Sequence, residues 1–454
     1  MISHIVNLRY HLLPQRLILG FFVLLGFIFL GLFSIEQYRI LMVLLSLCIL
    51  PVIIYLSVKY PESILWLCLM LYFTPGGEWP GNILVVFWGT VLVFHRFLIK
   101  KIRISLDPIL YLWIFILLNL VITVPKWLHL FKAFRGSIHF VFIPLIIYLS
   151  MAKGLIDDKG CDRFIGFYLP LAISYAIIQL SLKLLFSLEF FGHYVMRAHT
   201  GINLGWGYSN TLAAIMVLFA SVIISHPGFK AGKILQRLWF YYLLFIAITT
   251  PFIIISRGAV ISFLLGTILY LIFQSIMTGN LQIKKWLLFS GIVVIIVVVF
   301  FYSYLYALIW RFQNLRMDIS TFTRLHLIMD SLNAMRHNLL IGVGPNQRLF
   351  SEFYRYLEDP HNIFLRYGVD FGLISMLAFL LILIYPLSLL LKSVKKDKNK
   401  TLAIYGQFML PYYVAICNSQ IEAAITKYHY GIIFWTFYGL AIRRLHRVTS
   451  DSEK

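Results

Sequence analysis

Charged residues are scarce in this sequence. They make up 13% of its 454 residues, while 61% are hydrophobic and 17% are aromatic. A soluble globular protein carries about a quarter charged residues, so the shortage excludes that class. The apolar runs are continuous rather than alternating, and about 17–25 such residues cross a bilayer as a helix. We therefore predict an all-α polytopic integral membrane protein.

The sequence also lacks the motifs of redox, metal and nucleotide chemistry. Its four cysteines form no C-x-x-C pair, so neither a disulfide framework nor a zinc site is expected. It contains no P-loop, no Rossmann glycine pattern, no H-E-x-x-H and no D-x-D motif. We expect no cofactor and no metal. The ionisable residues in or beside the apolar runs are Lys183, Arg366 and Asp370. An ion-coupled transporter carries more of them.

About fourteen apolar runs are candidate transmembrane helices, or twelve if the two short ones near 64–75 and 138–152 do not span. The order of apolar and polar stretches sets their approximate limits. The runs are 17–34, 40–57, 64–75, 83–98, 108–124, 138–152, 164–188, 209–225, 238–256, 259–278, 286–308, 363–391, 402–420 and 428–442.

Membrane topology explains the net charge of +21 without nucleic acid, because Lys and Arg concentrate in cytoplasmic loops. With the amino terminus in the cytoplasm, the short loops rich in basic residues fall inside. These loops hold the clusters at 96–103, 230–237, 392–400 and 443–447. The prediction places both termini in the cytoplasm and expects no nucleic-acid partner.

This topology divides the chain into a transmembrane bundle (1–308), an extracytoplasmic helical loop (309–361), C-terminal spans (362–443) and a cytoplasmic tail (444–454). The long loop shows helical periodicity, and Ser320 is a candidate cap of its first helix. A break follows at 342–346, where Asn346 is a candidate cap of a second helix. We expect the loop to cover the outer mouth of the bundle. Its periodic apolar residues are Phe322, Leu325, Ile328, Met329, Leu332 and Met335, followed by Leu349, Phe350, Phe353 and Leu357.

A second outer segment, 125–136, has the pattern of a basic amphipathic helix. Trp127, Leu128, Phe131 and Phe134 share one face, and Lys126, His129, Lys132 and Arg135 share the other. Such a helix is typical of the lipid headgroup plane. The alternative is that it guides an anionic lipid-linked substrate.

Lysine is absent between positions 311 and 366, although it is common in the inner loops. Arginine presents a planar fork that binds two phosphate oxygens at once. The exclusion of lysine therefore favours a diphosphate site, with headgroup contacts or loop salt bridges as the alternative for most of these residues. The seven arginines are Arg311, Arg316, Arg324, Arg336, Arg348, Arg355 and Arg366.

Arg257 lies between two apolar runs with almost no loop around it. A charge at such a place is costly unless it faces water, protein or an anion. An anion site at this turn is the preferred interpretation, and a snorkelling arginine is the alternative.

His361 stands at the outer entrance of a predicted span. On a helix that starts near Asn362, the small residues Gly368, Gly372 and Ser375 share one face, along which a neighbouring helix approaches closely. His361 lies seven residues before Gly368, so the same spacing aims it at the mouth of the bundle. An imidazole there can accept a proton from a hydroxyl near neutral pH. Asp370, an intramembrane carboxylate, strengthens the functional interpretation.

These motifs together resemble those of the bacterial O-antigen ligase and O-antigen polymerase superfamily. Its C-terminal signature is matched by His361-Asn362, nine residues and Gly372, with Ser375 in place of Gly, Thr or Tyr. The stretches 323–346, 256–262 and 207–214 are similar to three further family segments. Asp370 stands where the family commonly has Glu. The resemblance covers roughly the C-terminal half of the chain.

The resemblance implies a membrane glycosyltransferase that acts on glycans linked to undecaprenyl diphosphate, without metal and with inversion. Arg257 and Arg324 would bind the diphosphate, and His361 would assist attack by an acceptor hydroxyl. The implied partners are the lipid-linked glycan, a lipid A–core or other envelope glycan acceptor, and membrane lipids. The implied site faces outward from the cytoplasmic membrane. Possible supporting residues are Asn362, Asp370, Asn210, Arg336, Arg348 and Arg366.

Two alternatives remain beside the ligase. A polymerase that joins lipid-linked repeat units would share every residue above. A flippase or transporter for lipid-linked glycans would also be a basic protein with many spans, but it needs neither an ordered outer cap nor a histidine at a helix mouth.

Overall fold

The computed structural model describes residues 50–101, 106–127, 130–186, 204–206, 209–254, 256–278, 313, 319–346, 361–422 and 424–450. These residues form helices and turns, and no strand occurs among them. The structure divides into two units, residues 1–59 and residues 60–454. The described part of the first unit is the apolar helix Leu50–Lys59. Everything below concerns the second unit.

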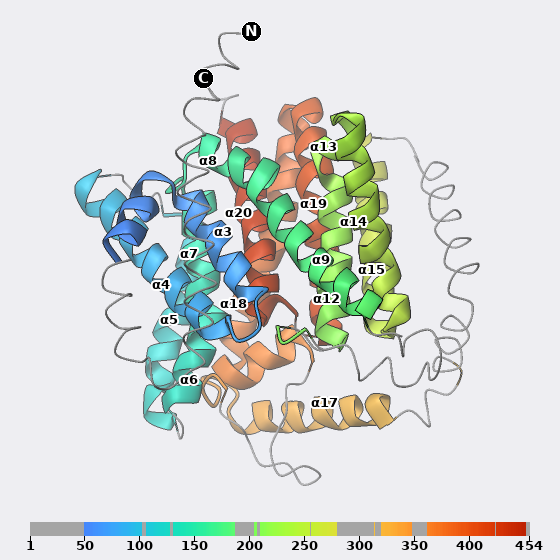
Figure 1. Cartoon of the computed structure of the whole chain (residues 1–454). Helices are drawn as coiled ribbons and strands as arrows, with labels where there is room; N and C mark the ends of the chain where they lie inside the picture. Colours follow the sequence, from blue (N-terminus) through green and yellow to red (C-terminus); the bar gives the residue numbers. More distant parts are fainter. Residues whose placement is uncertain are drawn as a thin grey trace, which may run out of the picture. The chain divides into compact units, whose positions relative to one another are not determined.

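Long helices dominate the second unit (Figure 1). Short 3-10 and π-helical turns extend several of them, as at Ile138–Phe142. In chain order the α-helices are α3 (Pro61–Tyr72), α4 (Glu78–Phe94), α5 (Pro108–Thr123), α6 (Leu130–Ser137), α7 (Ile143–Ala152), α8 (Asp158–Arg163), α9 (Leu169–Phe186), α12 (Ser209–Ser225), α13 (Pro227–Ala231), α14 (Ile234–Ile253), α15 (Arg257–Thr278), α17 (Ile319–His337), α18 (Ile363–Lys396), α19 (Lys398–Glu422) and α20 (Tyr428–Ser450).

The predicted class, an all-α polytopic membrane protein, is confirmed. Among the described residues, seven helical stretches are long and apolar enough to cross a membrane. Helix α20 runs on to Ser450 and takes in 444–450 of the predicted tail. The predicted spans 17–34 and 286–308 lie outside the described residues. The seven stretches are Glu78–Ile99, Pro108–Lys126, Lys132–Ala152, Asp158–Leu184, Ile234–Ile253, Arg257–Thr278 and Ile363–Lys396.

Helices α15 and α19 pack antiparallel. The Nζ atom of Lys398, at the start of α19, donates to the carbonyl of Thr278 at the end of α15. Farther along, a Cβ placed on Gly266 would lie 2.7 Å from the backbone of Val414, so the glycine permits close helix contact. Arg257, at the start of α15, therefore lies at the end of the bundle where α19 finishes.

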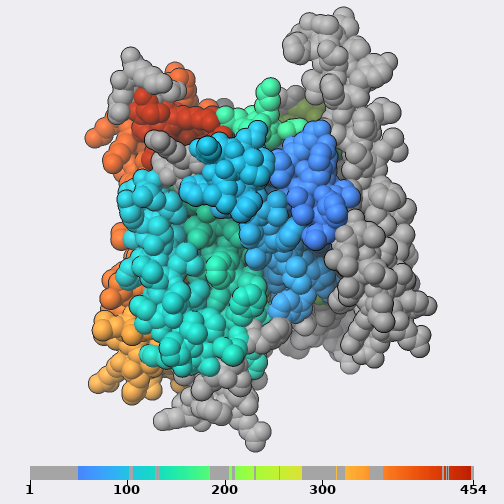
Figure 2. Space-filling model, turned by 90° about the vertical axis from the view of Figure 1, so that its left-hand side faces the viewer, coloured from blue at the N-terminus to red at the C-terminus, as the bar shows by residue number. Residues whose placement is uncertain are grey.

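The starts of α12 and α18 lie at that same end. Asn418 of α19 donates to the carbonyl of Ala214 in α12 (3.2 Å). Asn362, before α18, donates to the side chain of Gln420 in α19 (3.2 Å). We call this the His361 end. Figure 1 shows α17 lying across it, and Figure 2 shows the light-orange surface of α17 beside the teal surface around α6.

Helix α18 is interrupted at Gly372, where φ is +82° and ψ is 171°. The prediction of one continuous helix is wrong here. The segment 339–344 pairs with the opened turn: Val343 N–H donates to the Val369 carbonyl, Gly344 N–H to the Asp370 carbonyl, and Leu373 N–H to the Leu339 carbonyl, at 2.9, 2.9 and 2.7 Å. Tertiary hydrogen bonds thus replace helical ones at the break.

The predicted close approach along the small-residue face is confirmed at two positions. A Cβ on Gly368 would lie 2.4 Å from the methyl carbon of Met335 in α17, and one on Gly372 would lie 2.3 Å from the carbonyl oxygen of Leu340. The element that approaches at Gly372 is an irregular segment rather than a helix. Ser375, the third member, is fully buried.

The first helix of the predicted loop exists as α17, but its buried face agrees only in part with the predicted apolar set, which includes Met335 and omits Leu327. Leu325, Met329 and Leu332 are exposed, whereas Leu327 and Met335 are buried in one cluster with Val343 and Val369. Apolar residues lie all round this helix, so their spacing does not select a face. The helix starts at Ile319, so Ser320 lies inside its first turn. The second predicted helix, 349–357, is outside the described residues.

The amphipathic segment 125–136 does not form a separate helix. Helix α6 begins at Leu130 and continues through the π-turn into α7, and Lys132–Ala152 is one candidate span. Arg135, expected on a free polar face, donates to the carboxylate of Glu78. Lys126 donates to the carbonyl of Gly342 at 3.2 Å, so this segment supports the paired loop.

We predict that Gly372→Ala destabilises the protein by at least about 1–3 kcal/mol, the cost of that backbone conformation alone. The added methyl group would also meet the Leu340 carbonyl. Thermal unfolding of the purified protein in detergent measures the effect. Gly166→Ala is the matched control, because nothing lies within 4 Å of its Cβ position. Equal melting temperatures for the two variants would contradict the structural role of the break.

Candidate functional site

His361 lies just before α18, with a left-handed φ of +55°, and is partly buried. Asn362 is the N-cap: its Oδ1 accepts from the N–H groups of Phe364 and Leu365 at 3.0 and 3.1 Å. Because the cap residue itself is extended, His361 stands outside the helix. The predicted helical spacing from Gly368 therefore does not set its direction. Its position at the end of the bundle is set by the bonds between Asn362 and Gln420.

Arg257 is the first residue of α15 and is partly buried. The connection from α14 is as tight as predicted, since α14 ends at Ile253. Ser256 is buried, and its N–H donates to the carbonyl of Pro251 at 2.9 Å. The amino terminus of a helix carries partial positive charge, which adds to the charge of the guanidinium group there.

Arg324 lies on the buried face of α17, one turn before Leu327 and two turns before Ser331, which are both buried. Helical geometry thus directs Arg324 to the side of α17 that packs on the bundle. Arg336 is exposed, on another side of the helix. The structure separates these two arginines, which sequence reasoning had grouped.

Arg366 and Asp370 form a largely buried ion pair, with Nε and Oδ2 3.0 Å apart. The same guanidinium donates to Oδ1 of Asn346 and lies 5.0 Å from the ring centre of Phe140. Asn346 also donates to the carbonyl of Lys132 at 3.3 Å. These contacts fasten the loop 342–346 to α18 and α6. The helix that Asn346 is predicted to cap lies outside the described residues.

Asn210, the second residue of α12, is partly buried at the His361 end. Arg348 lies outside the described residues. The structure therefore brings Arg257, Arg324, His361 and Asn210 to one end of the bundle, with Arg366 and Asp370 in the support behind them.

Asn119 is a site-supporting residue that sequence reasoning missed. Its Nδ2 donates to the carbonyl of Phe371 at 2.5 Å and to Oγ of Ser375 at 2.6 Å. It thereby satisfies a carbonyl beside the break at Gly372. In the sequence, Asn119 is an isolated amide within the apolar run 108–124, and a polar side chain there needs a partner. This feature could have identified the residue.

The candidate site is rich in cations. Guanidinium groups and a helix amino terminus stabilise oxyanions, and an imidazole transfers protons. Within the described ranges, no group of three or more His, Cys, Asp or Glu residues gathers to hold a metal ion.

These features define a class: a multi-pass helical membrane protein with arginines, a histidine and a fastened loop at one end of its bundle. Residues 242–380 match the family model described as O-antigen ligase. For residues 242–380, this match bears out the resemblance that the sequence motifs indicated. It spans most of α14, all of α15 and α17, and the first half of α18. The protein is thus a membrane protein with the domain of a glycan-transferring enzyme family. No curated protein matches the chain.

We predict that Asp370→Asn lowers stability by about 3–5 kcal/mol, because it removes the carboxylate that pairs with the largely buried Arg366 cation. The melting temperature in detergent measures the loss. Asp397→Asn removes the carboxylate partner of Lys400, whose side chain is 68% exposed, and should change the melting temperature little. Similar small shifts in both variants would show that the buried pair stabilises the loop no more than a surface pair does.

Proposed function

We propose that the protein transfers a glycan from undecaprenyl diphosphate to a hydroxyl group of an envelope acceptor such as lipid A–core. The reaction is metal-independent, inverts the anomeric carbon and takes place at the outer face of the cytoplasmic membrane. The observation that carries this proposal is the common location of Arg257, Arg324 and His361 at one end of the bundle. These residues come from three separate elements and fall within the O-antigen ligase match.

His361 acts as the general base in this proposal. The acceptor hydroxyl gives its proton to the imidazole while its oxygen forms a bond to the anomeric carbon. The bond from that carbon to the diphosphate oxygen breaks on the opposite face of the sugar. Undecaprenyl diphosphate leaves with the electron pair of that bond.

Arg257 and Arg324 bind the diphosphate. Negative charge builds on the leaving group in the transition state, and prearranged guanidinium groups stabilise it there. Each fork engages two phosphate oxygens, which a lysine ammonium does not do. These charges supply the stabilisation for which other transferases use a divalent cation.

The charge pattern supports an outward-facing site. The basic cluster that includes Lys392 and Lys396 lies at the finish of α18, and Arg443 and Arg447 lie in the last turns of α20. Both helices begin at or next to the His361 end, so these clusters lie at the opposite end. Concentrated basic residues mark the cytoplasmic side. On this assignment, both termini are cytoplasmic and residues 309–361 form the external loop.

We predict that His361→Ala, Arg257→Ala and Arg324→Lys each lower transfer at least roughly 100-fold, in line with the loss of a general base or of a charge-stabilising donor. The measurement is product formation by purified protein from a lipid-linked glycan in detergent. Arg336→Ala is the matched control on α17 and should keep most activity, because that side chain is exposed. Near-normal transfer by His361→Ala or Arg257→Ala would defeat the assignment. Absence of product with the unaltered protein would favour a transporter.

The ligase and polymerase forms of the proposal differ in their donor and acceptor. We predict that a deletion strain accumulates carrier-linked polymer and an unmodified acceptor, as expected for a ligase. A glycolipid gel measures this. A single repeat unit attached to the acceptor would instead identify a polymerase.

A further inference from the structure

A cavity of about 540 Å³ lies at the end of the bundle away from His361. Its walls are the finish of α7 with Lys153 and Gly154, the last turns of α20, and Asp107 before α5. Lys396, at the finish of α18, donates to the Thr449 carbonyl at 2.6 Å, so the ends of α18 and α20 meet here. Neither the family match nor the proposed reaction uses these residues. The volume is within the range of small-ligand sites.

Cationic groups outnumber carboxylates in the described part of the chain around this cavity. Lys153 pairs with Asp107, with Nζ and Oδ2 2.7 Å apart. Arg443 and Arg447 share a single carboxylate, that of Asp158. Lys392 and Lys396 add charge from α18, so that among the described residues named here five cationic side chains stand against two carboxylates. The carbonyl ends of α7 and α20 offset part of this excess.

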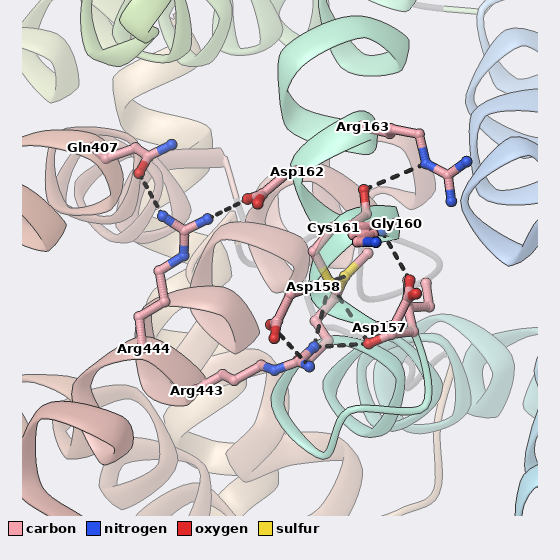
Figure 3. A network of polar contacts seen from close by, with 12 residues as sticks. Asp157, Asp158, Gly160, Cys161, Asp162, Arg163, Gln407, Arg443 and Arg444 are labelled. Atoms are coloured by element: carbon pink, nitrogen blue, oxygen red, sulfur yellow. Dashed lines mark hydrogen bonds and ion pairs between the residues drawn. The ribbon is translucent and has the colours of Figure 1, made fainter. Parts of the chain in front are cut away.

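The two arginines already converge on one oxyanion, as Figure 3 shows for Arg443. Nη2 of Arg443 lies 2.9 Å from Oδ1 of Asp158, and Nη2 of Arg447 lies 2.8 Å from Oδ2. Arg443 is held from behind, since its Nη1 donates to the carbonyl of Ile156 at 2.7 Å. One carboxylate neutralises one of these two guanidinium groups. Two forks around a shared oxyanion suit a phosphate group.

We propose that this cavity binds the phosphate group of an anionic ligand. Its surroundings favour an anionic phospholipid headgroup as the source. Three apolar side chains near the cavity are about half exposed or more. They are Leu106 next to Asp107, Tyr111 one turn into α5, and Leu391 of α18. Apolar side chains exposed beside a cationic pocket provide places for acyl chains, and the bilayer brings the headgroup to the pocket. Inorganic phosphate shares the same chemistry, so the test separates the two sources.

The test uses purified full-length protein in detergent and follows its melting temperature with added phosphatidylglycerol, phosphatidylcholine, or inorganic phosphate against chloride at equal ionic strength. Arg447→Gln removes a half-exposed fork from the cavity wall. Arg444→Gln is its matched control: it removes a guanidinium from the same helix, paired with Asp162 at 2.6 Å, that does not line the cavity.

Phosphatidylglycerol is expected to raise the melting temperature of the unaltered protein and of Arg444→Gln. Arg447→Gln should need roughly tenfold more lipid for the same rise, as the loss of one charge-assisted hydrogen-bonding group implies. The same pattern with inorganic phosphate but not with the lipid also supports the cavity and identifies a soluble ligand. No stabilisation by either ligand overturns the proposal, as does an equal response of the two variants or an equal effect of phosphatidylcholine.

Discussion

The candidate site depends on one contact, the pairing of residues 339–344 with the interrupted turn of α18. In a membrane span, an opened turn leaves backbone groups without partners, and each is costly in an apolar surrounding. Here the loop supplies two N–H donors and one carbonyl acceptor, and Asn119 supplies a further donor to Phe371. The break in the helix and the loop that fills it therefore stabilise each other. Gly372 is required because the backbone of Leu340 occupies the space of its side chain.

This pairing also holds α17 across the end of the bundle. Leu327 and Met335 of α17 pack with Val343 of the loop and Val369 of α18 in one small core. The ion pair of Arg366 and Asp370 adds a polar fastening through Asn346. Residues 319–346 thus have a rigid inner edge. Arg324 lies on the packed face of this helix, so its placement follows from the same contact.

The sequence predicts the seven long membrane-spanning candidates of the described residues, because continuous apolar runs are a local property with one dominant explanation. The count of fourteen spans stays a prediction. The sequence also predicts that Gly368 and Gly372 allow close approach. It does not predict the break at Gly372, since the partner of the opened turn is a segment about thirty residues away in the chain. The buried face of α17 is missed for a related reason: its apolar residues surround the helix, and only packing on Val369 selects Leu327 over Leu325.

The relative positions of the proposed site residues depend on helix packing elsewhere in the bundle. Asn362 ties His361 to Gln420 of α19, while Arg257 begins α15. The two residues are therefore related through the α15–α19 contact. That contact is close at Gly266 and is reinforced by the stacked rings of Tyr270 and Tyr405, whose centres are 4.8 Å apart. The proposed proton transfer and diphosphate binding require fixed relative positions, and a pair of rigid packed helices maintains such positions better than mobile loops do.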